Sequence, residues 1–150
     1  MKKIAVLFCV FVAYFLLSCG SAKKDEVHVT KLKLGNYSYI LSDSAGNELV
    51  KGNIKIDAFS PDKSKKNPDK FSGVYTVSYK DTANMFLGSE TLRDGAFSGL
   101  YNSSLGTTTF DMNPGVADAN VFISAANYQD SLDGYWYFST MRGSRTGGFF

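Results

Sequence analysis

The sequence predicts an all-β protein: an antiparallel meander that closes into a β-barrel of about eight strands. From Leu32 onward, apolar and polar residues alternate with a period of two, which is typical of strands that bury one face. No window of eleven or more residues keeps a helical stripe, and short turn-forming segments separate the alternating runs. A two-sheet β-sandwich is the alternative architecture.

The alternation is clearest at residues 50–58, where Val50, Ile54 and Ile56 share one face while Lys51 and Lys55 lie on the other. We expect a second long strand at residues 71–79. Further strands are predicted at residues 37–42, 85–93, 96–103, 107–112, 120–126, 135–141 and 148–150. Residues 43–47, 113–115 and 130–134 read as turns, and Asp94-Gly95 as a two-residue hairpin turn.

A short internal repeat supports a curved sheet. Phe71-Ser72-Gly73 recurs as Phe97-Ser98-Gly99, and residues 132–136 and 34–37 are looser copies. Glycine near the start of a strand lets the strand coil and lets a ring pack closely against its backbone. Repeated around a sheet, such bends close a barrel and remove exposed strand edges. A barrel of about eight strands is either filled by side chains or holds one small ligand.

These glycine–aromatic strands and short hairpins resemble the small lipocalin-like and avidin-like barrels, which include many bacterial lipoproteins. The resemblance spans roughly residues 32–150 and implies a barrel with a ligand pocket. Those families carry Gly-x-Trp on the first strand, whereas Gly134-Tyr135-Trp136 lies near the end of this chain. Because a domain of this size has little core to spare, we expect a mostly filled interior.

The first residues have the features of an export signal. Lys2 and Lys3 precede 14 uncharged, mostly apolar residues, 4–17. A membrane-spanning helix needs about 20 such residues, whereas the core of a signal peptide needs about 7–15. Leu16-Leu17-Ser18-Cys19 resembles the lipobox of bacterial lipoproteins. The resemblance implies cleavage before Cys19 and acylation of its thiol and new amine; an ordinary secretory signal or an uncleaved anchor is the alternative.

The predicted organisation is a signal peptide at 1–18, a lipidated cysteine and tether at 19–30, and a β-barrel domain at 31–150. Cys9 is removed with the signal, so the mature chain keeps Cys19 alone and has no disulfide. The acyl chains on Cys19 make the membrane the first expected partner. The expected location is the cell envelope, anchored by lipid to the outer membrane, with the periplasmic or surface face left open.

Composition excludes several functional classes. The chain has 16 basic and 14 acidic residues, and removing Lys2 and Lys3 leaves 14 of each. A neutral mature chain predicts no nucleic-acid partner. The single histidine, His28, lies in the tether and Cys19 is acylated, so histidine-assisted nucleophilic catalysis and zinc binding lack their usual side chains. We therefore expect no enzyme, no cofactor and no metal. Four aspartates in turn segments suit turn chemistry: Asp43, Asp94, Asp130 and Asp133.

Two segments are candidate binding sites. Tyr135 and Tyr137 share one face of a strand and Trp136 the other, so one set of rings is free for a sugar or a partner protein. Residues 60–70 form a lysine-rich loop that either improves solubility or contacts an anionic partner through Lys63, Lys65 and Lys66. The expected function is a non-enzymatic binding or accessory module. The alternatives are a hydrolase inhibitor or protective lipoprotein, and a lipocalin-like carrier of a small apolar ligand.

Overall fold

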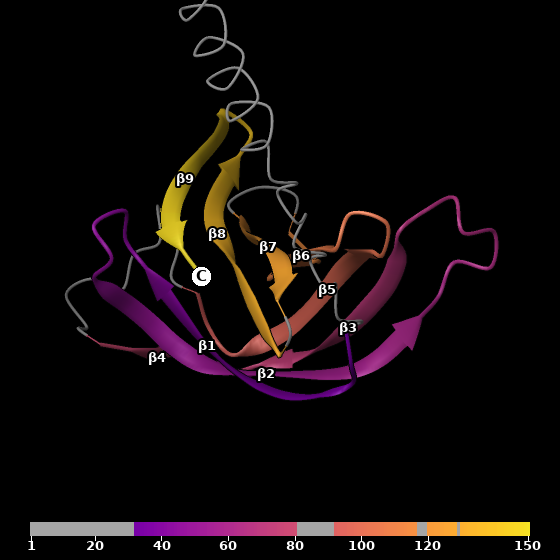
Figure 1. Ribbon diagram of the computed structural model, residues 1–150. Coiled ribbons are helices and arrows are strands. Elements are labelled where there is room, and N and C mark those ends of the chain that lie inside the picture. The colour runs from indigo at the N-terminus through magenta and orange to yellow at the C-terminus, as the bar shows by residue number, and fades with distance from the viewer. Residues whose placement is uncertain (1–31, 81–91, 117–119, 129) are drawn as a thin grey trace, which may run out of the picture.

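The computed structural model describes residues 32–80, 92–116, 120–128 and 130–150. They form one antiparallel sheet that curls into a half-barrel, which confirms the predicted meander (Figure 1). Its spatial order is β1-β2-β3-β5-β6-β7-β8-β9, with the short β4 also paired to β2. The strands are β1 (Gly35–Ser42), β2 (Glu48–Ser60), β3 (Asp69–Tyr75), β4 (Ser78–Tyr79), β5 (Gly95–Asn102), β6 (Thr107–Asp111), β7 (Asn120–Tyr128), β8 (Ser131–Thr140) and β9 (Gly143–Phe149).

The strand predicted at residues 71–79 is divided into β3 and β4. The break lies at Thr76, whose backbone N–H donates to the Asn53 carbonyl (2.9 Å) and whose hydroxyl accepts from the Asn53 N–H (3.1 Å). The Tyr39 hydroxyl donates to the Thr76 carbonyl (3.0 Å). These bonds satisfy the backbone where the ladder is interrupted. Residues 85–91 of a further predicted strand lie outside the described residues.

One predicted turn is wrong, and another is shorter than predicted. Gly95 is the first residue of β5 and pairs with Tyr75, while the Asp94 carboxylate accepts from the backbone N–H of Val77 (2.7 Å). Asp94-Gly95 therefore caps the break between β3 and β4 and does not close a hairpin. Residues 131–134 belong to β8, because Ser131 already pairs with Tyr128. By contrast, Asp43 forms the predicted turn: its carboxylate accepts from the backbone N–H groups of Ala45 and Asn47.

The two copies of Phe-Ser-Gly pair with each other across β3 and β5. Phe71 lies opposite Gly99, Ser72 opposite Ser98 and Gly73 opposite Phe97. Each ring thus lies over a glycine on the neighbouring strand, and a Cβ on Gly99 would overlap the Phe71 ring. A Cβ on Gly73 would overlap the Lys55 carbonyl oxygen of β2. The repeat is therefore a reciprocal glycine–aromatic contact between β3 and β5.

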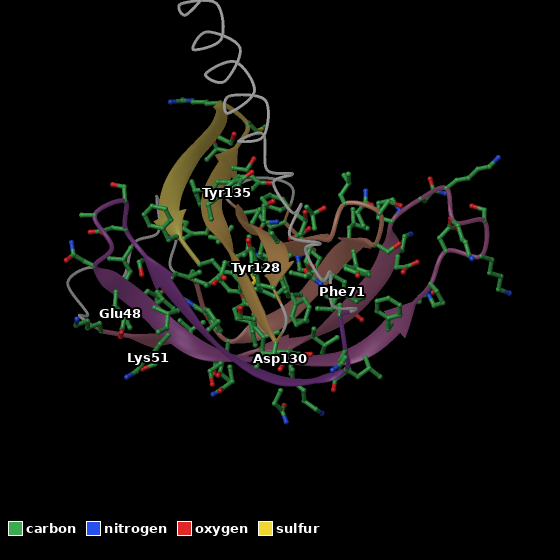
Figure 2. The ribbon with its side chains drawn as sticks, viewed as in Figure 1. Glu48, Lys51, Phe71, Tyr128, Asp130 and Tyr135 are labelled. Atoms are coloured by element: carbon green, nitrogen blue, oxygen red, sulfur yellow. The ribbon has the colours of Figure 1, made fainter. Side chains whose placement is uncertain are left out.

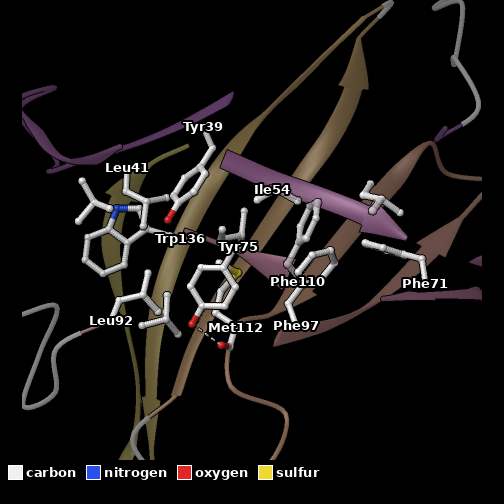
Figure 3. Packing of buried hydrophobic residues seen from close by; sticks show 14 of the residues in the cluster. Tyr39, Leu41, Ile54, Phe71, Tyr75, Leu92, Phe97, Phe110, Met112 and Trp136 are labelled. Carbon is white, nitrogen blue, oxygen red and sulfur yellow. Dashed lines mark hydrogen bonds between the residues drawn. The ribbon is translucent and has the colours of Figure 1, made fainter. Parts of the chain in front are cut away.

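Aromatic rings fill the concave side of the half-barrel (Figure 3). Phe71, Phe97 and Phe110 are mutual neighbours, with ring centroids 5.1–5.9 Å apart. The buried Tyr75 hydroxyl donates to the Met112 carbonyl (2.7 Å), and burial raises the pKa of Tyr75 to about 12. The phenol is therefore neutral and able to donate at physiological pH. Burial of these side chains stabilises the described sheet.

Trp136 connects β8, near the end of the chain, to β1. Its indole N–H donates to the Ser42 carbonyl at the end of β1 (2.8 Å), 94 residues away along the chain. Gly148 of β9 is buried against the backbone of Ser42 and Asp43, where a Cβ would find no space. Among the described residues, however, no ladder joins β1 to β9. The sheet is consequently held together at the Ser42 end of β1 and stays open along the rest of that strand.

Candidate functional site: an outer aromatic patch

The structure separates the three aromatic residues singled out on β8. Tyr135 is 48% exposed and Tyr137 is partly exposed, whereas Trp136 is 4% exposed and lies in the core. The alternation expected from the sequence is present, and Trp136 is on the concave side. Its indole N–H is engaged by Ser42, so Trp136 positions strands rather than meeting a ligand on the outer face. A site on the outer face can therefore use Tyr135 and Tyr137 alone of these three.

Strand pairing brings two more rings to the outer tyrosines. Phe122 of β7 lies opposite Tyr137, and Phe149 of β9 lies opposite Tyr135. Residues directly opposite in an antiparallel pair point to the same side of the sheet. The four side chains thus form one cluster across β7, β8 and β9, which we call the outer aromatic patch: Phe122, Tyr135, Tyr137 and Phe149.

The rings of the outer aromatic patch are ordered against one another. Phe122 and Tyr137 stack nearly in parallel, with centroids 5.3 Å apart and an interplanar angle of 16°. Tyr135 is tilted by 37° to Tyr137 at 6.1 Å. Tyr135 and Phe149 remain about half exposed, at 48% and 58%. Adjacent exposed rings of this kind mark an interaction surface more often than scattered apolar residues do.

Glycines in β9 allow the strand that carries Phe149 to pack closely against its neighbours. Gly147 lies against the Trp136 ring, where a Cβ would overlap the indole. The ladder between β8 and β9 also shifts register between Trp136 and Tyr137. Bulges of this type re-aim the side chains that follow them. The close approach to the indole and the register shift thus immediately precede Phe149, which pairs with Tyr135.

Tyr137 is the patch tyrosine whose protonation is affected by its surroundings. Burial raises the pKa of Tyr137, and the nearby Tyr135 and Asp111 raise it further. Asp111 is itself held by the Asn120 side-chain amide (2.6 Å) and by the Asn113 backbone N–H (3.1 Å). The hydroxyls of Tyr135 and Tyr137 make no hydrogen bond within the part of the chain that the structure describes. Two phenol groups are thus available to a ligand as donors and acceptors.

The lysine loop lies elsewhere. Lys63, Lys65 and Lys66 are exposed in the connection between β2 and β3, which Figure 1 shows projecting away from β8 and β9. The Asp62 carboxylate organises this loop by accepting from the Ser64 hydroxyl (2.6 Å) and from the Lys66 and Asn67 backbone N–H groups (both 3.0 Å). These bonds lower the pKa of Asp62. The lysines and the outer aromatic patch therefore do not form one site.

The described residues contain no group of three or more histidine, cysteine, aspartate or glutamate side chains placed to hold a metal ion. They also contain no helix with the length and apolar character needed to cross a membrane. Cys19 and His28 lie outside the described residues. Comparison with protein-family models, curated proteins and solved structures gives no significant match.

Sequence reasoning missed Phe122 and Phe149 as site residues. Both were placed in predicted strands, at residues 120–126 and 148–150, and alternation alone assigns each a face. The missing information was the register that sets Phe122 beside Tyr137 and Phe149 beside Tyr135. Tyr128 pairs with Ser131 at the start of β8, and this pairing belongs to the register that places Phe122 beside Tyr137.

Proposed function

We propose that this protein is a lipid-anchored, non-enzymatic binding module of the bacterial cell envelope that binds envelope glycan on its outer aromatic patch. The observation that carries the proposal is the patch itself: four adjacent rings on one sheet face, two of them about half exposed. Monomeric domains rarely leave such clusters uncovered without a partner.

The chemistry of the patch favours a sugar. A pyranose ring has a face of C–H groups that packs on an aromatic ring and a rim of hydroxyls that needs hydrogen-bond partners. The stacked Phe122 and Tyr137 rings form the hydrophobic core of the patch, and the Tyr135 and Tyr137 hydroxyls provide free polar groups beside it. Tyrosine suits such a role because its apolar ring carries a polar end.

The anchor follows from Leu16-Leu17-Ser18-Cys19, which supports cleavage before Cys19 and acylation of that residue. A polar tether at 20–30 would then join the lipid to the folded domain. All described strands and core residues lie between Leu32 and Phe150. Residues 19–150 carrying Cys19→Ala, which we call the unlipidated form, therefore contain the whole described sheet and are suited to binding measurements in solution.

The test is a paired substitution, Tyr135→Ser with Phe149→Ser, in the unlipidated form. Co-sedimentation with purified peptidoglycan and with envelope polysaccharide is expected to show at least tenfold weaker binding than the parent. Truncation of central aromatic residues at an interface typically costs about 2 kcal/mol or more, and about 1.4 kcal/mol corresponds to tenfold in affinity. Leu105→Ser, which removes a 70% exposed side chain in the β5–β6 turn, is the matched control and should bind like the parent.

Both substitutions are on the surface, so thermal melts of the variants should differ little from the parent. Equal binding by the patch variant and the parent would contradict the proposed site. If no glycan preparation binds the parent, the glycan assignment is wrong. Capture of an envelope hydrolase that depends on Tyr135 would replace the sugar by a protein partner.

A further inference from the structure

We propose that the open flank of the half-barrel is a second binding site, and that it takes a small amphipathic amine. A cavity of about 340 Å³ lies there, between residues 36–39 of β1, the underlying β2, the start of β8 and the C-terminal Phe150. The outer aromatic patch lines none of it. This site is therefore independent of the proposed glycan site.

The deep wall of the cavity is apolar. Ile54 and Ile56 of β2 and Phe110 of β6 line it, and all three side chains are almost fully buried. The Phe150 ring lies 6.1 Å from Phe110 and 6.4 Å from Tyr39. The hydroxyl of Tyr39 is already bonded to the Thr76 carbonyl, and that of Tyr37 to the Lys33 carbonyl (2.8 Å). The interior thus offers rings and methyl groups to the apolar part of a ligand.

Among the described residues that line the cavity, Asp130 is the one with an acidic side chain. Asp130 and Ser131, at the turn into β8, line one side (Figure 2 labels Asp130). Asn36 and Ser38 line the cavity along β1, but the Ser38 hydroxyl donates to the Asn53 side chain (3.4 Å) on the exposed face of the sheet. The Asp130 carboxylate makes no hydrogen bond or ion pair among the described residues. Asp43, Asp62, Asp94 and Asp111, in contrast, each accept from a backbone N–H group in or near a turn.

Charge selects the head group of the ligand. An amine at the rim would meet the exposed carboxylate of Asp130, whereas a carboxylate there would face a like charge. The cavity volume is near the lower limit of ligand pockets, which span about 300–1,000 Å³. A short alkyl or arylalkyl amine is therefore the class that fits.

The experiment is calorimetric titration of the unlipidated form with n-octylamine, n-octanol and octanoate, each below its aggregation limit. We expect n-octylamine to bind saturably and roughly fivefold more tightly than n-octanol, which is the gain from a partly exposed ion pair. Octanoate should bind more weakly than either compound. Asp130→Asn should abolish the preference for the amine and leave octanol binding unchanged. Ile56→Phe, which adds volume at the deep wall, should weaken all three compounds.

Asp130→Asn changes an exposed side chain and tests the head group even if Ile56→Phe does not fold. The patch variant carrying Tyr135→Ser and Phe149→Ser should keep amine binding, which separates this site from the proposed glycan site. Tighter binding of octanoate than of octylamine, or an amine preference that survives Asp130→Asn, would overturn the assignment of the head group. Absence of saturable binding by all three compounds would overturn the site itself.

Discussion

Gly73→Ala is expected to destabilise the fold by at least about 3 kcal/mol, the upper part of the range for overpacking a tightly packed site. The added Cβ would overlap the Lys55 carbonyl oxygen and press on the Phe97 ring. A backbone oxygen held in a sheet ladder cannot move aside as a side chain can. This loss is large relative to the total free energy of unfolding of a domain, which is only about 5–15 kcal/mol.

Thermal and urea unfolding of the unlipidated form would measure this loss. A fall in Tm on the order of 10 °C or more corresponds to a destabilisation of this size. Gly115→Ala is the matched control, because a Cβ there meets nothing within 4 Å. A Gly73→Ala variant as stable as the Gly115→Ala variant would show that β2 and β3 do not approach as described.

The reciprocal contact can be tested further at its other end. Gly99→Ala places a Cβ on the Phe71 ring, so its cost should shrink when Phe71→Leu removes that ring. Independent costs for the two substitutions would mean that Phe71 and Gly99 are not paired.

We expect nearly all of the parent protein in the membrane fraction. Cys19→Ala is expected either to release the protein into the soluble fraction or to leave the precursor uncleaved. Each buried CH₂ of an acyl chain contributes about 0.8 kcal/mol, and stable anchoring needs more than one chain. Acylation of both the thiol and the new amine of Cys19 would satisfy that condition, and alanine provides no thiol to acylate.

Fractionation of cells labelled with palmitate measures this effect. Cys9→Ala is the matched control, since Cys9 lies within the apolar run of the signal and should leave both label and membrane association unchanged. Palmitate label retained by the Cys19→Ala protein would contradict the lipobox assignment.

The sequence predicted most of the described strands, but it did not predict which strands pair with which or where two of them begin and end. Alternation at residues 50–58 identified β2, and glycine next to aromatic residues indicated close packing. That the two Phe-Ser-Gly segments pair with each other depends on the register of β3 and β5, which local pattern does not contain. The hairpin turn predicted at Asp94-Gly95 was wrong for a related reason. The Asp94 carboxylate accepts a hydrogen bond from the backbone N–H of Val77, which is 17 residues away along the chain.

The candidate site was predictable in part. Alternation separates Tyr135 and Tyr137 from Trp136, but aromatic residues on both faces of β8 leave the buried face undetermined. The face is decided by tertiary contacts: the Trp136 indole reaches Ser42, and Gly147 leaves room for its ring. The flank cavity could not be located from the sequence, because residues from β1, β2, β6 and β8 line it and local pattern does not contain their relative placement.

The most direct test of glycan binding at the outer aromatic patch is to map the contact residues. Backbone amide chemical shifts of the unlipidated form should be followed by NMR during titration with soluble envelope glycan fragments. The predicted result is saturable shifts concentrated in β7, β8 and β9 around Phe122, Tyr135 and Phe149, with the β2–β3 lysine loop and residues 36–39 unaffected. Shifts confined to the lysine loop or to the flank cavity, with β7–β9 silent, would contradict it.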